Sequence, residues 1–172
     1  EQKCISRAIN IFSKIQSKYP KAIYTIIGPD GGSLAKLKNQ VNEMGIQESV
    51  RFAGPMSINS IKKLSSEASF YLQTSKLEGM AMSVVEAMQL GLLPIVTPVG
   101  EIKNYCTDSI NSLHIIDTET VIKSICNILE DRSLYNLMRS RAIAQWQSHE
   151  IYSESVIRAS KKILNLNNKG IA

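Results

Sequence analysis

The chain has few of the residues from which several common kinds of functional site are built. It contains three cysteines and two histidines among 172 residues. Cys4, Cys106 and Cys126 have no CxxC spacing and no histidine cluster nearby, so neither a disulfide framework nor a zinc site is supported. No Asp-x-Asp pair is present to hold a hard divalent cation, and no Ser/His/Asp or Cys/His pairing arises from local motifs. We expect a reducing, cytoplasmic compartment and a site that needs neither metal nor cofactor.

Long apolar runs and basic clusters are also absent. No segment has the apolar length that spans a bilayer, and the opening Glu1-Gln2-Lys3 is not a signal sequence. The net charge of +5 comes from scattered Lys and Arg without an aromatic-interleaved basic run. This pattern favours a solvated surface over a nucleic-acid groove, and it leaves open a weak attraction to an anionic membrane or to phosphate-bearing substrates.

The composition of the chain, with 44% hydrophobic and 20% charged residues, is typical of a single globular domain over residues 1–172. Helical and strand patterns alternate along it, separated by short loops with glycine or proline. We expect helices at about 5–15, 33–45, 58–66, 82–90, 101–106, 119–130, 132–147 and 150–166, and strands at 22–27, 50–53, 70–73, 93–97 and 113–116. Pro94 predicts an edge or N-terminal place in its strand. The alternation predicts an α/β fold, with a Rossmann-like, doubly wound parallel sheet and extra C-terminal helices.

Ligands of such sheets bind beyond the carboxyl ends of the strands. Four of those ends carry turn or polar residues, and we expect them to share one rim of the sheet. They are Gly28, Gly54-Pro55, the Thr74-Ser75 loop with Glu78, and Thr97-Pro98.

The stretch from Glu78 to Met88 contains the most informative pattern. A loop carboxylate and Gly79 run into an apolar helix that carries a second carboxylate, Glu86. A helix N-terminus offers unpaired N–H groups and partial positive charge to a diphosphate. Each carboxylate can accept two hydrogen bonds from a vicinal diol, such as that of a ribose or a hexose. The pattern therefore favours a sugar nucleotide as ligand, although Glu86 alone could be a solvated surface residue and Glu78 alone an ordinary loop carboxylate.

Other functions fit the residues less well. The Gly28-Pro-Asp-Gly31-Gly32 turn is not GxGxxG, which weakens a nicotinamide or flavin site. A glycosidase pair of Glu78 and Glu86 is disfavoured, because these residues flank a helix start in a parallel sheet and belong to a phosphate-type site. A non-catalytic module that binds a sugar nucleotide or a protein stays open as the alternative.

Several motifs in order resemble the C-terminal, donor-binding domain of the retaining GT-B glycosyltransferases of family 4, the glycosyl transferases group 1 set. The similarity runs from about Lys3 to Ile116, and its most specific part is two glutamates separated by seven residues, followed by a G-L-P-I-V-like segment. The motifs are Ile27-Gly28-Pro-Asp-Gly31, Val50-Arg-Phe52-Ala-Gly54, Glu78-Gly79-Met-Ala-Met-Ser-Val-Val-Glu86-Ala87-Met88, Gly91-Leu-Leu-Pro94-Ile-Val96 and Pro98-Val-Gly100.

The resemblance implies a role for each matching residue. Glu86 would bind the ribose hydroxyls, and Glu78, as the catalytic residue, would face the hydroxyls of the donor sugar. Lys3 matches the lysine of a phosphate clamp. Other donor-binding positions are the backbone N–H groups of Gly79, Met80, Ala81 and Met82, together with Gly28, which allows close approach, and Gly54, beside the base.

The resemblance also implies what the chain would need and where it departs from the family. The donor would be a UDP- or GDP-sugar, and the acceptor a glycan or lipid, as in polysaccharide biosynthesis at the inner face of a membrane. The first strand, the clamp arginine and the N-terminal acceptor domain would lie outside residues 1–172, so we expect this fragment to bind a donor weakly and to transfer no sugar. Cys4, Ala81 and Ser112 stand where glycine is usual, as does Glu101, and Asn104 stands where glutamate is common.

Overall fold

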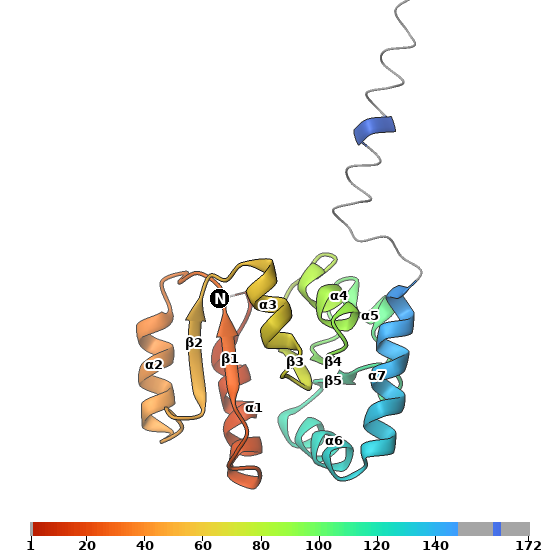
Figure 1. The fold of residues 1–172 in the computed structure, drawn as a ribbon. Helices are drawn as coiled ribbons and strands as arrows, with labels where there is room; N and C mark the ends of the chain where they lie inside the picture. The colour runs from red at the N-terminus through yellow and green to blue at the C-terminus, as the bar shows by residue number, and fades with distance from the viewer. Residues whose placement is uncertain (1, 148–159, 163–172) are drawn as a thin grey trace, which may run out of the picture.

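A computed structural model describes residues 2–147 and 160–162. Most of the helix expected at 150–166 falls outside these residues. The helices and strands alternate as the sequence predicts, and the bounds of nearly all agree within a few residues (Figure 1). The helices are α1 (Ile5–Lys18), α2 (Leu34–Glu43), α3 (Ile58–Ser65), α4 (Met82–Gln89), α5 (Ile102–Tyr105), α6 (Thr118–Glu130) and α7 (Arg132–Gln147). The strands are β1 (Tyr24–Ile27), β2 (Val50–Gly54), β3 (Phe70–Gln73), β4 (Leu93–Val96) and β5 (Leu113–His114).

All of these strands pair in parallel, which confirms the α/β class, but they form two sheets where we expected one. The first sheet has the order β1-β2 and the second the order β3-β4-β5. Figure 1 shows β1, β2 and α2 on one side of the molecule and β3 to β5 with α4 to α7 on the other. Within the described residues, no strand pairs with the second edge of β1 or with the free edge of β3, so the two sheets are not joined by hydrogen bonds between strands.

Pro94 is not at an edge, because β4 is the central strand of its sheet. It is the second residue of β4 and lies opposite Tyr71 of β3. The pairing of β4 with β5 begins only one residue later, at Ile95 and Leu113. Because Pro94 lies near the N-terminal end of the strand, it avoids the loss of a ladder hydrogen bond. Of the two places that the sequence predicts for it, an edge strand or the N-terminal end of a strand, the second is confirmed.

Helix α1 joins the two halves of the core. Its sequence places apolar residues on two adjoining faces, so that Ile9 and Phe12 pack with α2 and β2 while Ile11 and Ile15 pack with β4, β5 and α6. A third apolar cluster holds α4 and α5 against β4 and α7. Within the part of the chain that the structure describes, no helix has both the length and the apolarity to cross a membrane.

Candidate functional site

The two glutamates of the sequence pattern lie on either side of the start of α4, Glu78 in the preceding loop and Glu86 within the helix. Ala81 precedes this helix in the left-handed conformation, with φ of 53°, and turns the chain from the Glu78 loop into α4. Four apolar residues of α4, Val84, Val85, Ala87 and Met88, are buried, whereas Glu86 is exposed. The helix is thus anchored by its apolar face, and the Glu86 carboxylate is free to meet solvent or a ligand.

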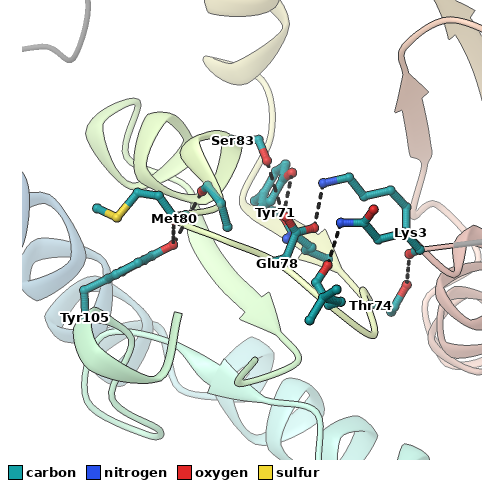
Figure 2. Close-up of polar contacts among 11 residues, drawn as sticks. Lys3, Tyr71, Thr74, Glu78, Met80, Ser83 and Tyr105 are labelled. Atoms are coloured by element: carbon teal, nitrogen blue, oxygen red, sulfur yellow. Dashed lines mark hydrogen bonds and ion pairs between the residues drawn. The ribbon is translucent and has the colours of Figure 1, made fainter. Parts of the chain in front are cut away.

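The Glu78 side chain is buried and forms an ion pair. Its Oε1 lies 2.6 Å from Lys3 Nζ, and the side chains of Lys3 and Glu78 are 55% and 7% exposed, respectively (Figure 2). The sequence places both residues in the site but does not predict this pair. Lys3, expected to face a phosphate, here neutralises the carboxylate that we expect to face the sugar.

Hydrogen bonds fasten the segment around Lys3 to the loop that carries Glu78. Thr74 Oγ1 is within hydrogen-bond distance of the carbonyls of Lys3, at 3.1 Å, and Cys4, at 2.8 Å. The backbone N–H of Lys76 donates to the Gln2 carbonyl, and the Gln2 amide donates to the Leu77 carbonyl. These contacts fix the Lys3 backbone beside the Glu78 loop.

A tyrosine of α5 positions the chain that leads into α4. The Tyr105 hydroxyl donates to the Met80 carbonyl at 2.8 Å and also lies 3.4 Å from the Ala81 carbonyl (Figure 2). Burial raises the pKa of Tyr105, and the nearby Cys106 thiol and Glu78 carboxylate raise it further, so the phenol stays a donor. Because it holds the carbonyls, Tyr105 fixes the conformation of the turn from which the first N–H groups of α4 point outward.

The loop after β4 packs directly on the Glu78 loop. The Glu101 N–H donates to the Gly79 carbonyl at 3.1 Å. Gly100, with φ of 59°, is so close that an added Cβ would overlap the backbone carbonyls of Glu78 and Gly79. The Glu101 side chain turns to Asn104, whose amide donates to it at 2.7 Å. The carboxylate that replaces the usual glycine thus has a local partner.

The Tyr71 phenol is close enough to Glu78 and Glu86 for both charges to affect its pKa. Burial raises the pKa of Tyr71, a hydrogen bond with Ser83 partly offsets this, and both carboxylates raise it further through their charge. Tyr71 and Ser83 both donate to Gln73 Oε1, at 3.2 and 3.3 Å. The end of β3 and the start of α4 are therefore connected by polar side chains.

The two glycines of the first sheet lie in a separate part of the rim. The Gly28 N–H donates to the Gly54 carbonyl at 3.0 Å, at the carboxyl ends of β1 and β2. Their φ values of 141° and 68° favour glycine, and an added Cβ at either position would meet open space. The described hydrogen bonds join these glycines to each other and not to the Glu78 loop, so the structure groups the predicted residues into two sets.

Lys3, Glu78, Glu86 and the Gly79–Met82 segment form the first set, with the start of α4 between the two glutamates in sequence. Among residues 2–147 and 160–162, no group of three or more His, Cys, Asp or Glu side chains could hold a metal ion. Such an arrangement can bind a phosphate at the N–H groups and hydroxyls at the carboxylates.

Four of the residues around this site are not in the sequence prediction. Tyr71 and Gln73 alternate at the end of a strand, Ser83 is the second residue of α4, and Tyr105 lies 19 positions after Glu86. The alternation of polar residues at a strand end that borders a ligand rim is a signal that could have indicated the first two. Nothing local in the sequence relates Tyr105 to the Met80 carbonyl.

Comparison with known proteins is consistent with this geometry. The family model described as "Glycosyl transferases group 1" matches residues 1–145. The chain is 27% identical over 150 residues to a human subunit of phosphatidylinositol N-acetylglucosaminyltransferase, covering 87% of this chain and 30% of that protein. The chain thus spans about a third of the length of this relative.

Two of the solved structures that share the fold illustrate the similarity. One is a point mutant of S. aureus TarM in complex with fondaparinux, α-GlcNAc-glycerol and UDP, at a TM-score of 0.79 and 19% identity, over 96% of this chain and 33% of that one. The other is the C-terminal domain of the group 1 family glycosyl transferase LpcC from Francisella tularensis, at a TM-score of 0.76 and 18% identity, over 86% of this chain and 80% of that one. The observed α/β architecture is thus that of the C-terminal, Rossmann-like domain of GT-B glycosyltransferases.

Proposed function

Because the chain belongs to the glycosyl transferases group 1 family, we propose that it is the donor-binding domain of a retaining glycosyltransferase that uses a UDP- or GDP-sugar. The observation that supports this proposal most directly is the placement of Glu78 and Glu86. The start of α4 follows Glu78, whose side chain is buried beside Lys3, and precedes Glu86, which is exposed on the helix. One nucleotide sugar could therefore meet a phosphate-binding helix start and two diol-binding carboxylates together.

Each group has a separate task in this proposal. Glu86, exposed on α4, binds the ribose hydroxyls, and Glu78 binds hydroxyls of the donor sugar beside the reacting carbon. The N–H groups around Gly79 to Met82 meet the diphosphate. Breaking the bond between sugar and phosphate leaves negative charge on the diphosphate, and fixed N–H dipoles stabilise that charge without rearrangement.

Lys3 supplies the mobile cation of the site. Its side chain is 55% exposed, so it can turn from Glu78 Oε1 toward an arriving phosphate with little loss of packing. Glu78 would then exchange its ion pair for hydroxyls of the sugar. The exchange keeps the buried carboxylate partnered in the free and in the bound state, which avoids the cost of an unpaired buried charge.

The acceptor and the location are part of the same proposal. The human relative carries phosphatidylinositol in its name, and a glycan or lipid acceptor at the cytoplasmic face of a membrane would suit this chain. A further domain, N-terminal to this one in the family's plan, would choose the acceptor. The alternative, a non-catalytic module, would keep the fold and transfer no sugar.

Nucleotide binding tests the proposal. The chain would be titrated by calorimetry and thermal unfolding with UDP, GDP, UDP-N-acetylglucosamine, GDP-mannose and NAD. One nucleotide series should raise the Tm, since a ligand at 100 times its Kd stabilises by about 2.7 kcal/mol, and NAD should not. Absence of binding by every UDP and GDP compound would overturn the proposal and favour a module that binds protein alone.

A further inference from the structure

We propose that Gln73, the last residue of β3, is an additional ligand-binding residue of this site. Its side-chain N–H group would donate a hydrogen bond to a phosphate oxygen of the bound nucleotide. The inference rests on the proposed function, because it needs a phosphate at the start of α4. It adds a residue that neither the sequence pattern nor the family resemblance assigns.

The orientation of the Gln73 amide is fixed from two directions. Tyr71 of the same strand and Ser83 of α4 both donate to its Oε1, at 3.2 and 3.3 Å. With the oxygen held by these two hydroxyls, the amide nitrogen must point elsewhere. The side chain is 5% exposed, so it is not held in place by solvent.

The amide nitrogen itself is without a partner. Among the residues that the structure describes, Gln73 Nε2 is buried and makes no hydrogen bond. A buried N–H group without an acceptor is costly, whereas a leucine or methionine would fill similar space without that cost. A bound molecule that supplies the acceptor would explain why a polar side chain stands at Gln73.

Two further unpartnered hydroxyls lie at the same ends of the sheet. Ser75 Oγ, two residues after β3 ends, and Thr97 Oγ1, directly after β4, are also buried without a hydrogen-bond partner within the described part of the chain. The backbone joins the two strand ends, because the Thr97 N–H donates to the Gln73 carbonyl at 3.0 Å. Ligands of parallel sheets bind at such carboxyl ends.

The chemistry of the nitrogen requires an acceptor, and its tie to the start of α4 favours a phosphate. An amide N–H can only donate, so its partner must be an acceptor. Glu78 and Glu86 are acceptors and suit the hydroxyls of the ligand. Ser83, the second residue of α4, ties Gln73 to the helix start, where backbone N–H groups already favour an anion. A phosphate oxygen accepts from both sources.

Two substitutions at this position would test the contact. Gln73→Leu removes the donor and keeps the bulk of the side chain. Gln73→Glu keeps an oxygen toward Tyr71 and Ser83 but places a second oxygen where the nitrogen was. The matched control is Gln40→Leu, because Gln40 Nε2 already donates within the chain, to the Ser6 carbonyl at 3.0 Å and to Asn10 Oδ1 at 2.7 Å.

Affinity would be measured by calorimetry for UDP and GDP, and for uridine and guanosine by ligand-observed NMR. For the nucleotide that the wild-type chain binds, Gln73→Leu should weaken the diphosphate about tenfold and leave the matching nucleoside unchanged. Gln73→Glu should weaken the diphosphate more, through repulsion. Gln40→Leu should change neither. An unchanged diphosphate affinity in Gln73→Leu, or an equal loss for the nucleoside, would overturn the inference.

A second measurement does not depend on the variants folding. In the wild-type chain, the Gln73 side-chain amide resonance should shift when UDP or GDP is added and stay in place with the nucleoside. A resonance that stays in place with the bound diphosphate overturns the inference and leaves the proposed function intact. A wild-type chain that binds none of these nucleotides overturns both.

Discussion

The strands of the two sheets differ in how far they are buried and in what they bring to the site. Every residue of β4 is buried, β3 ends in the network of Tyr71 and Gln73, and the loop after β3 carries Glu78 of the ion pair and the left-handed turn at Ala81. In β1 all but the last residue are half-buried, Ile27 is exposed, and the loops after β1 and β2 meet through the glycines at 28 and 54.

The described side-chain contacts of the rim are thus on the β3–β5 side, whereas a backbone hydrogen bond joins the glycines at 28 and 54. Around Glu78, neighbouring loops are in contact and leave no space for an extra atom at Gly100. Around Gly28 and Gly54, an added Cβ would meet nothing. We infer that the β3–β5 side fixes the diphosphate and sugar, and that the β1–β2 side gives space for a flat group such as a base.

The same substitution in each half should give the largest contrast. Gly100 and Gly54 have φ of 59° and 68°, so alanine meets a similar backbone strain of about 1–2 kcal/mol at both. At Gly100 the overlap with Glu78 and Gly79 adds about 1–3 kcal/mol. Urea unfolding should therefore show a clearly larger loss for Gly100→Ala than for Gly54→Ala. Equal losses would mean that the two halves are equally tolerant.

Removal of the Glu86 carboxylate should have the largest effect on affinity. Each hydrogen bond to a charged acceptor contributes about 1.5–3 kcal/mol, so Glu86→Ala should weaken UDP or GDP about tenfold or more. Stability should change little because the side chain is exposed. Glu43→Ala, an exposed glutamate on α2 in the other half, is the control and should leave the Kd unchanged. An unaltered Kd in Glu86→Ala would contradict the ribose assignment.

Substitutions of the two residues of the ion pair should differ in which ligand they weaken. Glu78→Ala should weaken the nucleotide sugar about tenfold through lost sugar contacts, and the bare diphosphate much less. Lys3→Met should weaken both ligands alike, because its charge would face the phosphates common to them. Calorimetry with UDP and UDP-N-acetylglucosamine, or with the GDP pair, distinguishes the two patterns. Identical profiles for the variants would remove Glu78 from the sugar.

Removal of a single hydroxyl group should have a smaller effect on nucleotide affinity. Tyr105→Phe releases the Met80 carbonyl, which should cost about 1 kcal/mol of stability and reduce nucleotide affinity about fivefold as the turn into α4 loosens. Tyr135→Phe is the matched control, since its hydroxyl donates to the Ser69 carbonyl away from the site. If both variants lower stability and neither changes the Kd, Tyr105 does not position the ligand.

The smallest effect is expected from metal ions. The chain has no Asp-x-Asp pair, and N–H groups with Lys3 are available for the diphosphate. Added Mg²⁺, Mn²⁺ or EDTA should therefore leave the nucleotide Kd within about twofold. Titration of the same nucleotide in the three conditions measures this, and a large loss with EDTA would show that a cation completes the site.

Periodicity and turn residues predict most of the fold. Apolar spacing indicates α1 and α6, and turn or polar residues at the ends of four strands indicate the rim. The division into two sheets could not be read from the sequence, because each strand pattern reports burial of its own residues and not the identity of its neighbours. Pro94 illustrates this: its place depends on where the adjacent β5 begins.

The candidate site was predictable only in part. Glu78 and Glu86 can be found in the sequence because they are close together and their spacing matches a known motif. The Lys3–Glu78 pair joins residues 75 positions apart, and Tyr105 acts through carbonyl groups that every residue has. Contacts of both kinds depend on how the loops meet in space. The roles of these residues in binding stay predictions.

The bonds between the Lys3 segment and the Glu78 loop have a consequence for the order of folding. They close a ring of about 70 residues that contains every element from α1 to β3. Contacts so distant in sequence form after local ones, because the entropy of closing the ring must be offset first. The carboxylate at Glu78 therefore acquires its cation late, after α4 can already form.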